Sequence, residues 1–261
     1  MSRVIAITGA SAGIGRAIAL RTARDGSAVA ICARRGPLLD KTAADIAAAG
    51  GQPFALVADV TQADDMHRFV GGTVERFGRL DVMICNAGFG IAGAIDQVTP
   101  DQMRRLFDVN YMGTFHAAAA GLAVFRRQQS GHLLVMSSIV GKRGVPYVGA
   151  YAATKFAQVG MAECLRAELA GSPIHVTVVY PVSTDSEFFD VMSRETGTTI
   201  VRAAGPRQKA AIVADAVATA IGHPVAEVYP HRASRALVWL NAIAPGYCDR
   251  VVKRFGRKPV R

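Results

Sequence analysis

The sequence predicts an α/β fold with a parallel sheet of about seven strands and helices on both of its faces. Short apolar, β-branched runs alternate with longer Ala-rich helical stretches, the order expected when parallel strands are joined by crossover helices. The runs are apolar on both faces, as in strands covered on each side. The 261-residue chain is 51% hydrophobic and shows no linker, repeat or low-complexity block, so we expect one domain over residues 1–261.

The predicted strands are VIAIT at 4–8, AVAICA at 28–33, PFALVA at 53–58, LDVMIC at 80–85, HLLVMS at 132–137, IHVTVVY at 174–180 and AEVYP at 226–230. The predicted helices are GIGRAIALRTARDG at 13–26, LLDKTAADIAAAG at 38–50, ADDMHRFVGGTVERFG at 63–78, a long stretch at 99–129 and the segment that begins at Tyr151. Crossovers between parallel strands are right-handed in nearly all proteins, so the sheet is expected to be doubly wound, as in a Rossmann fold.

The composition limits the classes of partner and compartment. No apolar run is long enough to cross a membrane, and the N-terminus becomes Gly-rich too early for a secretion signal, so we expect a cytoplasmic protein. Neither the cysteines nor the histidines have metal-ligand spacing, so no metal is expected. The cysteines, interpreted as reduced and structural, are Cys32, Cys85, Cys164 and Cys248.

The net charge of +10 is densest in the tail 249–261, where six basic residues face one Asp. A solvated tail, a phosphate-rich ligand and an anionic membrane surface are all compatible with it. No zinc-finger, RRM or helix-turn-helix pattern is present, so we expect no nucleic-acid partner.

The first strand is followed by TGASAGIG at 8–15, which opens the first helix. Gly9, Gly13 and Gly15 allow a sharp turn and close approach of a ligand to the backbone, and the helix N-terminus offers N–H groups to a pyrophosphate. The alternative is a tight turn without a ligand.

The second strand ends in ICARR, with Arg34 and Arg35 where an acid would bind a free ribose hydroxyl. Because arginine binds phosphate through charge-assisted hydrogen bonds, this end predicts NADP(H). Two surface arginines at the start of a loop are the alternative.

The segment AYAATKFAQVG at 150–160 places Tyr151 and Lys155 one helical turn apart, on the same face. A tyrosine has a pKa of about 10, and an ammonium at roughly 4 Å favours its phenolate. The pair therefore predicts a general acid/base whose pKa is lowered by the lysine, with an exposed stripe as the alternative.

With TGASAGIG, NAG at 86–88 and Tyr151-x-x-x-Lys155 in this order, the chain resembles the short-chain dehydrogenase/reductase family from residue 3 to about 185. The resemblance implies an oxidoreductase that interconverts a carbonyl and an alcohol. Arg34 and Arg35 predict NADP(H) as its cofactor, and the apolar residues after 185 predict a hydrophobic small molecule as its substrate. A dinucleotide-binding regulator without catalysis and a basic membrane or nucleic-acid binder are the rival classes.

The resemblance also implies roles for individual residues. The catalytic residues would be Ser138, Tyr151, Lys155 and Asn110, with Asn110 holding a water in a proton relay. Ser137 is the less favoured serine, because neighbours on a strand point to opposite faces. The cofactor-binding residues would be Gly9, Ser11, Gly13, Ile14, Gly15, Arg34, Arg35, Asp59, Val60, Asn86, Ala87, Gly88, Tyr151, Lys155, Pro181, Val182 and Thr184.

Two positions depart from the family pattern. Val182 follows Pro181 where a glycine is frequent, and Ala12 stands where many NADP-preferring members carry a basic residue. Arg34 is then the main determinant of NADP(H) preference, with Arg35 as a helper.

The substrate end is expected in residues 185–210, where Phe188, Phe189, Val191 and Met192 form either an apolar lid or a helix packed on the core. The extension 231–261, broken by Pro245 and Gly246, can pack beside the site, join subunits or rest on an anionic membrane. The resemblance implies a homodimer or homotetramer built from helices at 103–127 and 151–169. Lys142 and Arg143 are interpreted as loop charges.

Overall fold

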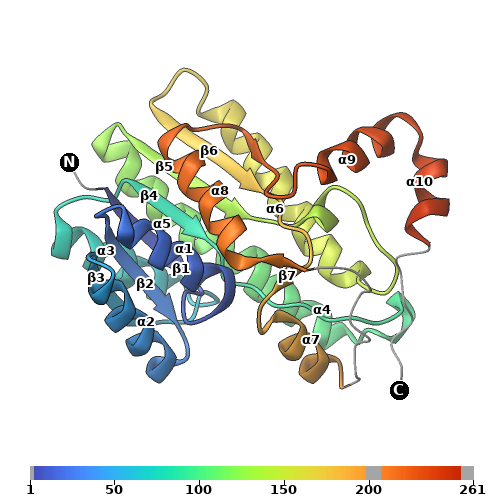
Figure 1. The fold of residues 1–261 in the computed structure, drawn as a ribbon, viewed down its shortest axis with the longest axis horizontal. Coiled ribbons are helices and arrows are strands. Elements are labelled where there is room, and N and C mark those ends of the chain that lie inside the picture. Colours follow the sequence, from blue (N-terminus) through green and yellow to red (C-terminus); the bar gives the residue numbers. More distant parts are fainter. Residues whose placement is uncertain (1–2, 198–206, 254–261) are drawn as a thin grey trace.

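The computed structural model describes residues 3–197 and 207–253, and its centre is a parallel sheet in the strand order β3-β2-β1-β4-β5-β6-β9 (Figure 1). The strands are β1 (Val4–Thr8), β2 (Ala28–Ala33), β3 (Gln52–Val57), β4 (Val82–Cys85), β5 (Gly131–Met136), β6 (Ile174–Val179) and β9 (Glu227–Val228). Every pairing in the sheet is parallel, which confirms the predicted fold class. The order reverses between β1 and β4, and ligands of such sheets bind beyond the carboxyl ends of the strands at this point.

Helices cover both faces of the sheet (Figure 1). They are α1 (Gly13–Arg24), α2 (Gly36–Ala48), α3 (Ala63–Phe77), α4 (Pro100–Leu106), α5 (Gly113–Gln128), α6 (Gly149–Glu168) and α8 (Ala210–Gly222). Helices α1, α2 and α8 pack their apolar residues on one face and share one core. Helices α3, α5 and α6 share the core on the opposite face. Both faces of the sheet are therefore shielded from water by helices. This explains why the strands are apolar on each side, as expected from the sequence.

The stretch expected as one helix at 99–129 is interrupted by a π-helical turn at Phe107–Met112. Thr99 and Gln102 form a reciprocal capping box that begins α4. After the turn, Gly113 lets the start of α5 approach the connection that follows β3, since a Cβ there would lie 2.5 Å from Val60. The turn places Asn110 in the interior, and wide turns of this kind are frequent at functional sites.

The chain after β6 forms β7 (Thr184–Asp185), α7 (Phe188–Thr196) and β8 (Gln208–Lys209), with β7 and β8 paired as a separate small sheet. Residues 198–206 of the segment expected as a lid lie outside the described residues.

The C-terminal extension forms α9 (Ser234–Ile243) and α10 (Pro245–Val252), separated at Pro245 as expected. Figure 1 shows this hairpin extending away from the sheet. Arg143 holds it, with hydrogen bonds to Asn241 on α9 and to Asp249 on α10. Lys142 pairs with Glu227 at 2.8 Å. Lys142 and Arg143 lie in a loop as interpreted from the sequence, and their ion pairs and hydrogen bonds also tie distant parts of the chain together. Residues 254–261 of the tail lie outside the described residues.

Within residues 3–197 and 207–253, no helix has the length and apolarity needed to cross a bilayer, and no group of acidic, His or Cys side chains is arranged as a metal site. All four cysteines are free. Cys32, Cys85 and Cys248 are buried, whereas Cys164 is exposed on α6, so the structural interpretation fits the first three and is wrong for Cys164.

Candidate active site

A cleft with a volume of about 1060 Å³ runs along the carboxyl edge of the sheet, from the turn between β1 and α1 to the lid helix α7. It is lined by the predicted residues Gly9, Ser11, Gly13, Ile14, Gly15, Arg34, Arg35, Asp59, Val60, Asn86, Ala87, Gly88, Ser138, Tyr151, Lys155, Pro181, Val182 and Thr184. Asn110 is the predicted site residue that does not line it. The fold thus gathers residues from almost the whole β–α series at one edge.

The glycine turn has backbone geometry that few residues other than glycine tolerate. Gly9 and Gly13 have positive φ values of 67° and 56°. A Cβ on Gly9 would lie 2.7 Å from the Cα of Ala87, and one on Gly15 would lie 2.5 Å from the Asn86 amide nitrogen. The first turn of α1 has no acidic residue, and Ala12 provides no side-chain cap, so the N–H groups at the helix start are free to bind an anion. These features fit a dinucleotide pyrophosphate.

Comparing Gly9→Ala with Gly26→Ala separates the cost of crowding at this turn from the cost of a positive φ. Gly26 has a φ of 76° and nothing within 4 Å of its missing Cβ, so Gly26→Ala should cost about 1–2 kcal/mol from its left-handed backbone alone. Gly9→Ala should cost about 1–3 kcal/mol more because of overpacking against Ala87. Urea unfolding of both variants measures the difference. Equal losses would show that the approach to Ala87 carries no cost.

Asn86 ties the ends of β1 and β4 together beneath the turn. Its Nδ2 donates to the carbonyl oxygens of Thr8 at 2.9 Å and Gly9 at 3.2 Å. The Thr8 hydroxyl oxygen accepts from the backbone N–H groups of Asn86 and Ala87, each at 3.0 Å. This network holds the floor of the cleft at the point where the strand order reverses.

The two arginines at the end of β2 differ in how they are engaged. Arg34 is 69% exposed, and its Nη1 lies 3.9 Å from the Asp59 carboxylate across the cleft edge. The Nη1 of Arg35 pairs with Glu187 at 2.8 Å, and its Nη2 donates to the Ser11 hydroxyl at 3.2 Å. Arg35 therefore links the glycine turn to the segment that begins α7, and Arg34 is the more accessible guanidinium.

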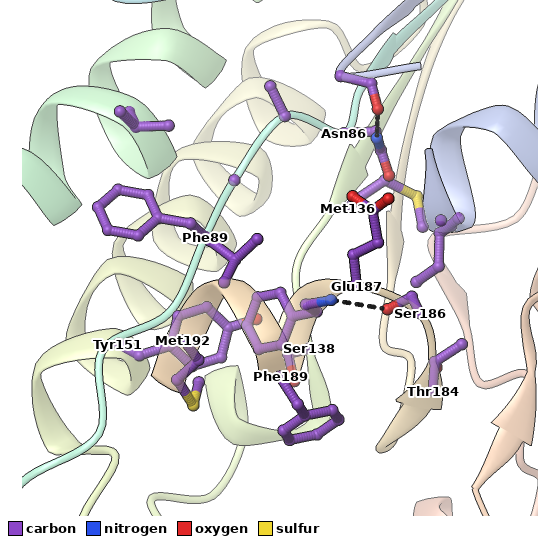
Figure 2. A pocket seen from close by; sticks show the side chains of 18 of the residues that line it. Asn86, Phe89, Met136, Ser138, Tyr151, Thr184, Ser186, Glu187, Phe189 and Met192 are labelled. Carbon is purple, nitrogen blue, oxygen red and sulfur yellow. Dashed lines mark hydrogen bonds between the residues drawn. The ribbon is translucent and has the colours of Figure 1, made fainter. Parts of the chain in front are cut away.

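Ser138 and Tyr151 both line the inner end of the cleft, where the Ser138 hydroxyl lies within hydrogen-bonding reach of the phenol. Figure 2 labels both side chains. The Ser138 hydroxyl also donates to the Pro181 carbonyl at 3.4 Å. Ser137 points the other way and donates to the Lys155 carbonyl within α6 at 3.0 Å. The alternation expected for neighbours at a strand end thus turns Ser138, and not Ser137, toward Tyr151.

Lys155 lies on the same face of α6 as Tyr151, with its Nζ 5.6 Å from the centre of the tyrosine ring. Burial raises the pKa of Tyr151, and the hydrogen bond from Ser138 opposes this. Burial also lowers the pKa of Lys155 to about 7. The pKa of Tyr151 is therefore raised and not lowered as predicted, because desolvation of the buried phenol is the largest cause of its shift.

Asn110 lies behind the cleft, and its side chain forms hydrogen bonds that fix the backbone of Phe89. Its Nδ2 donates to the Phe89 carbonyl at 2.9 Å and to the Thr154 hydroxyl at 3.0 Å, and its Oδ1 accepts from the Phe89 N–H at 3.0 Å. The sequence analysis did not include Gln158, which is fully buried and accepts a hydrogen bond from Lys155.

Helix α7 closes the cleft over Tyr151 with apolar side chains. The ring of Phe188 lies 5.4 Å from that of Tyr151, centre to centre. A Cβ on Gly90 would lie 2.2 Å from Met192 and 2.7 Å from Phe188, so the lid packs directly on this glycine. Phe189 packs against Phe188, with ring centres 5.6 Å apart. Figure 2 labels Met192 and Phe189 among the side chains that line this end of the cleft. Helix α7 is therefore packed on the rest of the chain, as the second alternative expects, and its apolar side chains line the cleft.

Comparisons with known proteins find relatives that are described as dehydrogenases or oxidoreductases. A family model described as short chain dehydrogenase matches residues 3–196. An uncharacterized oxidoreductase of Listeria monocytogenes is 34% identical over 194 residues, which cover 74% of this chain and 78% of that protein. One of Methylorubrum extorquens is 36% identical over 242 residues, which cover 92% and 93%. The structure of an alcohol dehydrogenase from Thermococcus sibiricus complexed with 5-hydroxy-NADP matches with a TM-score of 0.78 at 30% identity, over 88% of this chain and 96% of that one. The span 3–196 contains every residue predicted for catalysis and cofactor binding.

Proposed function

Because this chain belongs to the short-chain dehydrogenase/reductase family of oxidoreductases, we propose that it interconverts a carbonyl and an alcohol with NADP(H). The observation that carries the proposal is the buried Tyr151 hydroxyl, which hydrogen-bonds Ser138 at the inner end of a cleft that begins at a glycine turn. Apolar side chains surround this hydroxyl on the substrate side. A dinucleotide binder without catalysis has no need for such a group.

The proposed chemistry divides between the cofactor and the chain. When bound, the reduced nicotinamide would supply a hydride to the carbonyl carbon. Tyr151 would donate its phenolic proton to the carbonyl oxygen, so that the alcohol forms without a free alkoxide. The Ser138 hydroxyl, fixed at the end of β5, would donate a hydrogen bond to the same oxygen as its negative charge grows. Lys155 would hold the nicotinamide ribose.

The protonation state of Tyr151 suits its proposed role as the proton donor in carbonyl reduction. Burial raises the pKa of Tyr151 above that of a free tyrosine, so the phenol keeps its proton through the physiological pH range. A protonated phenol is the form that reduction of a carbonyl requires, whereas oxidation of an alcohol requires the phenolate. The raised pKa of Tyr151 therefore keeps the phenol in the form that the reduction step uses near neutral pH.

Cofactor preference follows from Arg34, which is exposed at the cleft edge. The Thermococcus sibiricus relative was solved with 5-hydroxy-NADP, which supports the phosphorylated cofactor. Arg34→Ala should weaken NADPH binding by roughly tenfold to a hundredfold, because a charge-assisted bond to the 2′-phosphate is worth about 1.5–3 kcal/mol. NADH binding should change little. Fluorescence titration measures both affinities.

The control for this measurement is Arg24→Ala, which removes an exposed arginine at the far end of α1 and should leave both affinities unchanged. Equal wild-type affinities for NADPH and NADH would overturn the assignment of NADP(H).

The lid points to a hydrophobic ketone or aldehyde as substrate, since α7 presents apolar side chains toward Tyr151. Following NADPH absorbance with a panel of carbonyl compounds tests the enzyme against the rival regulator. Absence of turnover across aliphatic, aromatic, steroid and acyl carbonyls would favour the regulator. Strongly salt-dependent association with polyanions would favour the membrane or nucleic-acid binder.

The homo-oligomeric state and the cytoplasmic location stay predictions. Phe115 on α5 and Phe156 on α6 are 47% and 46% exposed, and both lie on helices expected to join subunits. These two apolar side chains support a homo-oligomer built on α5 and α6.

A further inference from the structure

Gln158 is a buried amide that connects Lys155 to the π-helical turn. It lies on α6, one turn beyond Lys155, and its side chain has no exposed surface. Its Oε1 accepts from the Lys155 Nζ at 3.0 Å. Its Nε2 donates to the Asn110 carbonyl oxygen at 2.6 Å and to the Thr114 hydroxyl at 2.7 Å.

The chemistry of its partners fixes the orientation of this amide. The Lys155 ammonium can only donate hydrogen bonds, and the Asn110 carbonyl can only accept them. The amide oxygen must therefore face Lys155 and the nitrogen must face Asn110. Thr114 reinforces the arrangement, because its hydroxyl donates to the same Asn110 carbonyl at 2.7 Å.

The Lys155 ammonium is held by neutral acceptors from two elements. The backbone carbonyl of Met136 on β5 accepts one N–H at 2.8 Å, and Gln158 on α6 accepts another. The titratable side chain next to the Lys155 ammonium is Tyr151. Among the described residues, no carboxylate forms an ion pair with Lys155. Since an ammonium has three protons, one is left for a group in the cleft.

The family resemblance assigns Asn110 to a water-mediated proton relay, but the space between its carbonyl and Lys155 is spanned by the Gln158 amide. An amide neither gains nor loses a proton near neutral pH, so it cannot pass a proton along this line. We propose that Gln158 is a positioning residue, which aims the Lys155 ammonium at the cleft and closes the path to Asn110, so that Tyr151 is reprotonated from the cleft side. This inference rests on the proposed function.

Three variants test it. Gln158→Glu keeps the oxygen and adds a negative charge beside Lys155, Gln158→Met keeps the shape without polar atoms, and Gln158→Ala leaves room for a water. The matched controls are Gln128→Glu and Gln128→Met, because Gln128 bonds the backbone N–H and carbonyl of Leu80 away from the cleft. Thermal melting of every variant establishes that it is folded.

The first readout needs no turnover. NMR of protein labelled at lysine, without added NADPH, follows the titration of Lys155, whose signal is assigned by its loss in Lys155→Met. Gln158→Glu should raise the pKa of Lys155 by at least about one pH unit, because a carboxylate favours the ammonium. Gln128→Glu should leave the titration unchanged. An unmoved titration in Gln158→Glu would overturn the proposal, even if Gln158→Met fails to fold or the wild type shows no reductase activity.

The second readout separates positioning from structure. Gln158→Met and Gln158→Ala should lower kcat by about tenfold or more and also raise KM for NADPH, since a misplaced Lys155 affects both the reacting geometry and its proposed contact with the nicotinamide ribose. The Gln128 variants should keep the wild-type kcat. If Gln158→Ala turns over as fast as the wild type, a water relay past Asn110 suffices and the closed path is refuted.

Discussion

Tyr151→Phe should lower kcat for carbonyl reduction at least ~100-fold while the affinity for NADPH stays close to that of the wild type. The variant keeps the ring that packs against Phe188 at 5.4 Å and loses the hydroxyl that bonds Ser138. Without that hydroxyl, the substrate oxygen loses its proposed proton donor and keeps only the proposed hydrogen bond from Ser138. Steady-state kinetics and fluorescence titration of NADPH measure the two quantities.

The matched control is Tyr229→Phe. Burial also raises the pKa of Tyr229, and its hydroxyl donates to Glu227 at 2.9 Å, outside the cleft. Loss of a hydrogen-bonded hydroxyl there should leave kcat unchanged. If the two variants keep the same kcat as the wild type, the proton comes from another donor and the assignment of Tyr151 fails.

The parts of the fold that the sequence predicts well are those set by local pattern. Strands β1 and β2 begin and end where expected, because their apolar runs are bounded by polar or turn-forming residues. The position of the cleft could also be predicted, because parallel strands have their carboxyl ends at one edge of the sheet. The glycine turn, Asn86 and Tyr151 all lie at that edge.

The features that were missed depend on contacts between distant segments or on burial. Arg143 binds Asp249, more than a hundred residues further along the chain, so nothing near Arg143 reveals the contact. Gln158 has no distinguishing local pattern, and its role comes from the π-helical turn that brings the Asn110 carbonyl to it. The spacing of Tyr151 and Lys155 shows that they are neighbours, but it does not show how deeply they are buried. Desolvation by that burial sets the direction of both pKa shifts.

Lys155→Met should abolish most activity and also change how stability depends on pH. Activity should fall by roughly 1000-fold, because in the proposed mechanism the ammonium both holds the cofactor ribose and supports the charge that forms near Tyr151. Stability follows from the pKa of Lys155, which burial lowers from 10.5 to about 7. Below pH 7 both folded and unfolded wild-type chains carry the charge, so the full cost of burying it is present. Between pH 7 and 10.5 the folded protein releases this proton first, so wild-type stability rises with pH.

Lys155→Met lacks the pH-dependent contribution that Lys155 makes to the free energy of unfolding. The stability of the wild type relative to the variant should therefore increase by up to about 5 kcal/mol as the pH rises from 6 to 10.5. The hydrogen bonds to Met136 and Gln158 that the variant loses shift its stability equally at every pH, so they do not alter this slope. Urea unfolding across the pH range measures it, with Lys41→Met at an exposed position of α2 as the control. If the difference between wild type and Lys155→Met were as flat as that of the control, Lys155 would not be a buried ammonium, and neither its pKa near 7 nor its part in the proposed mechanism would stand.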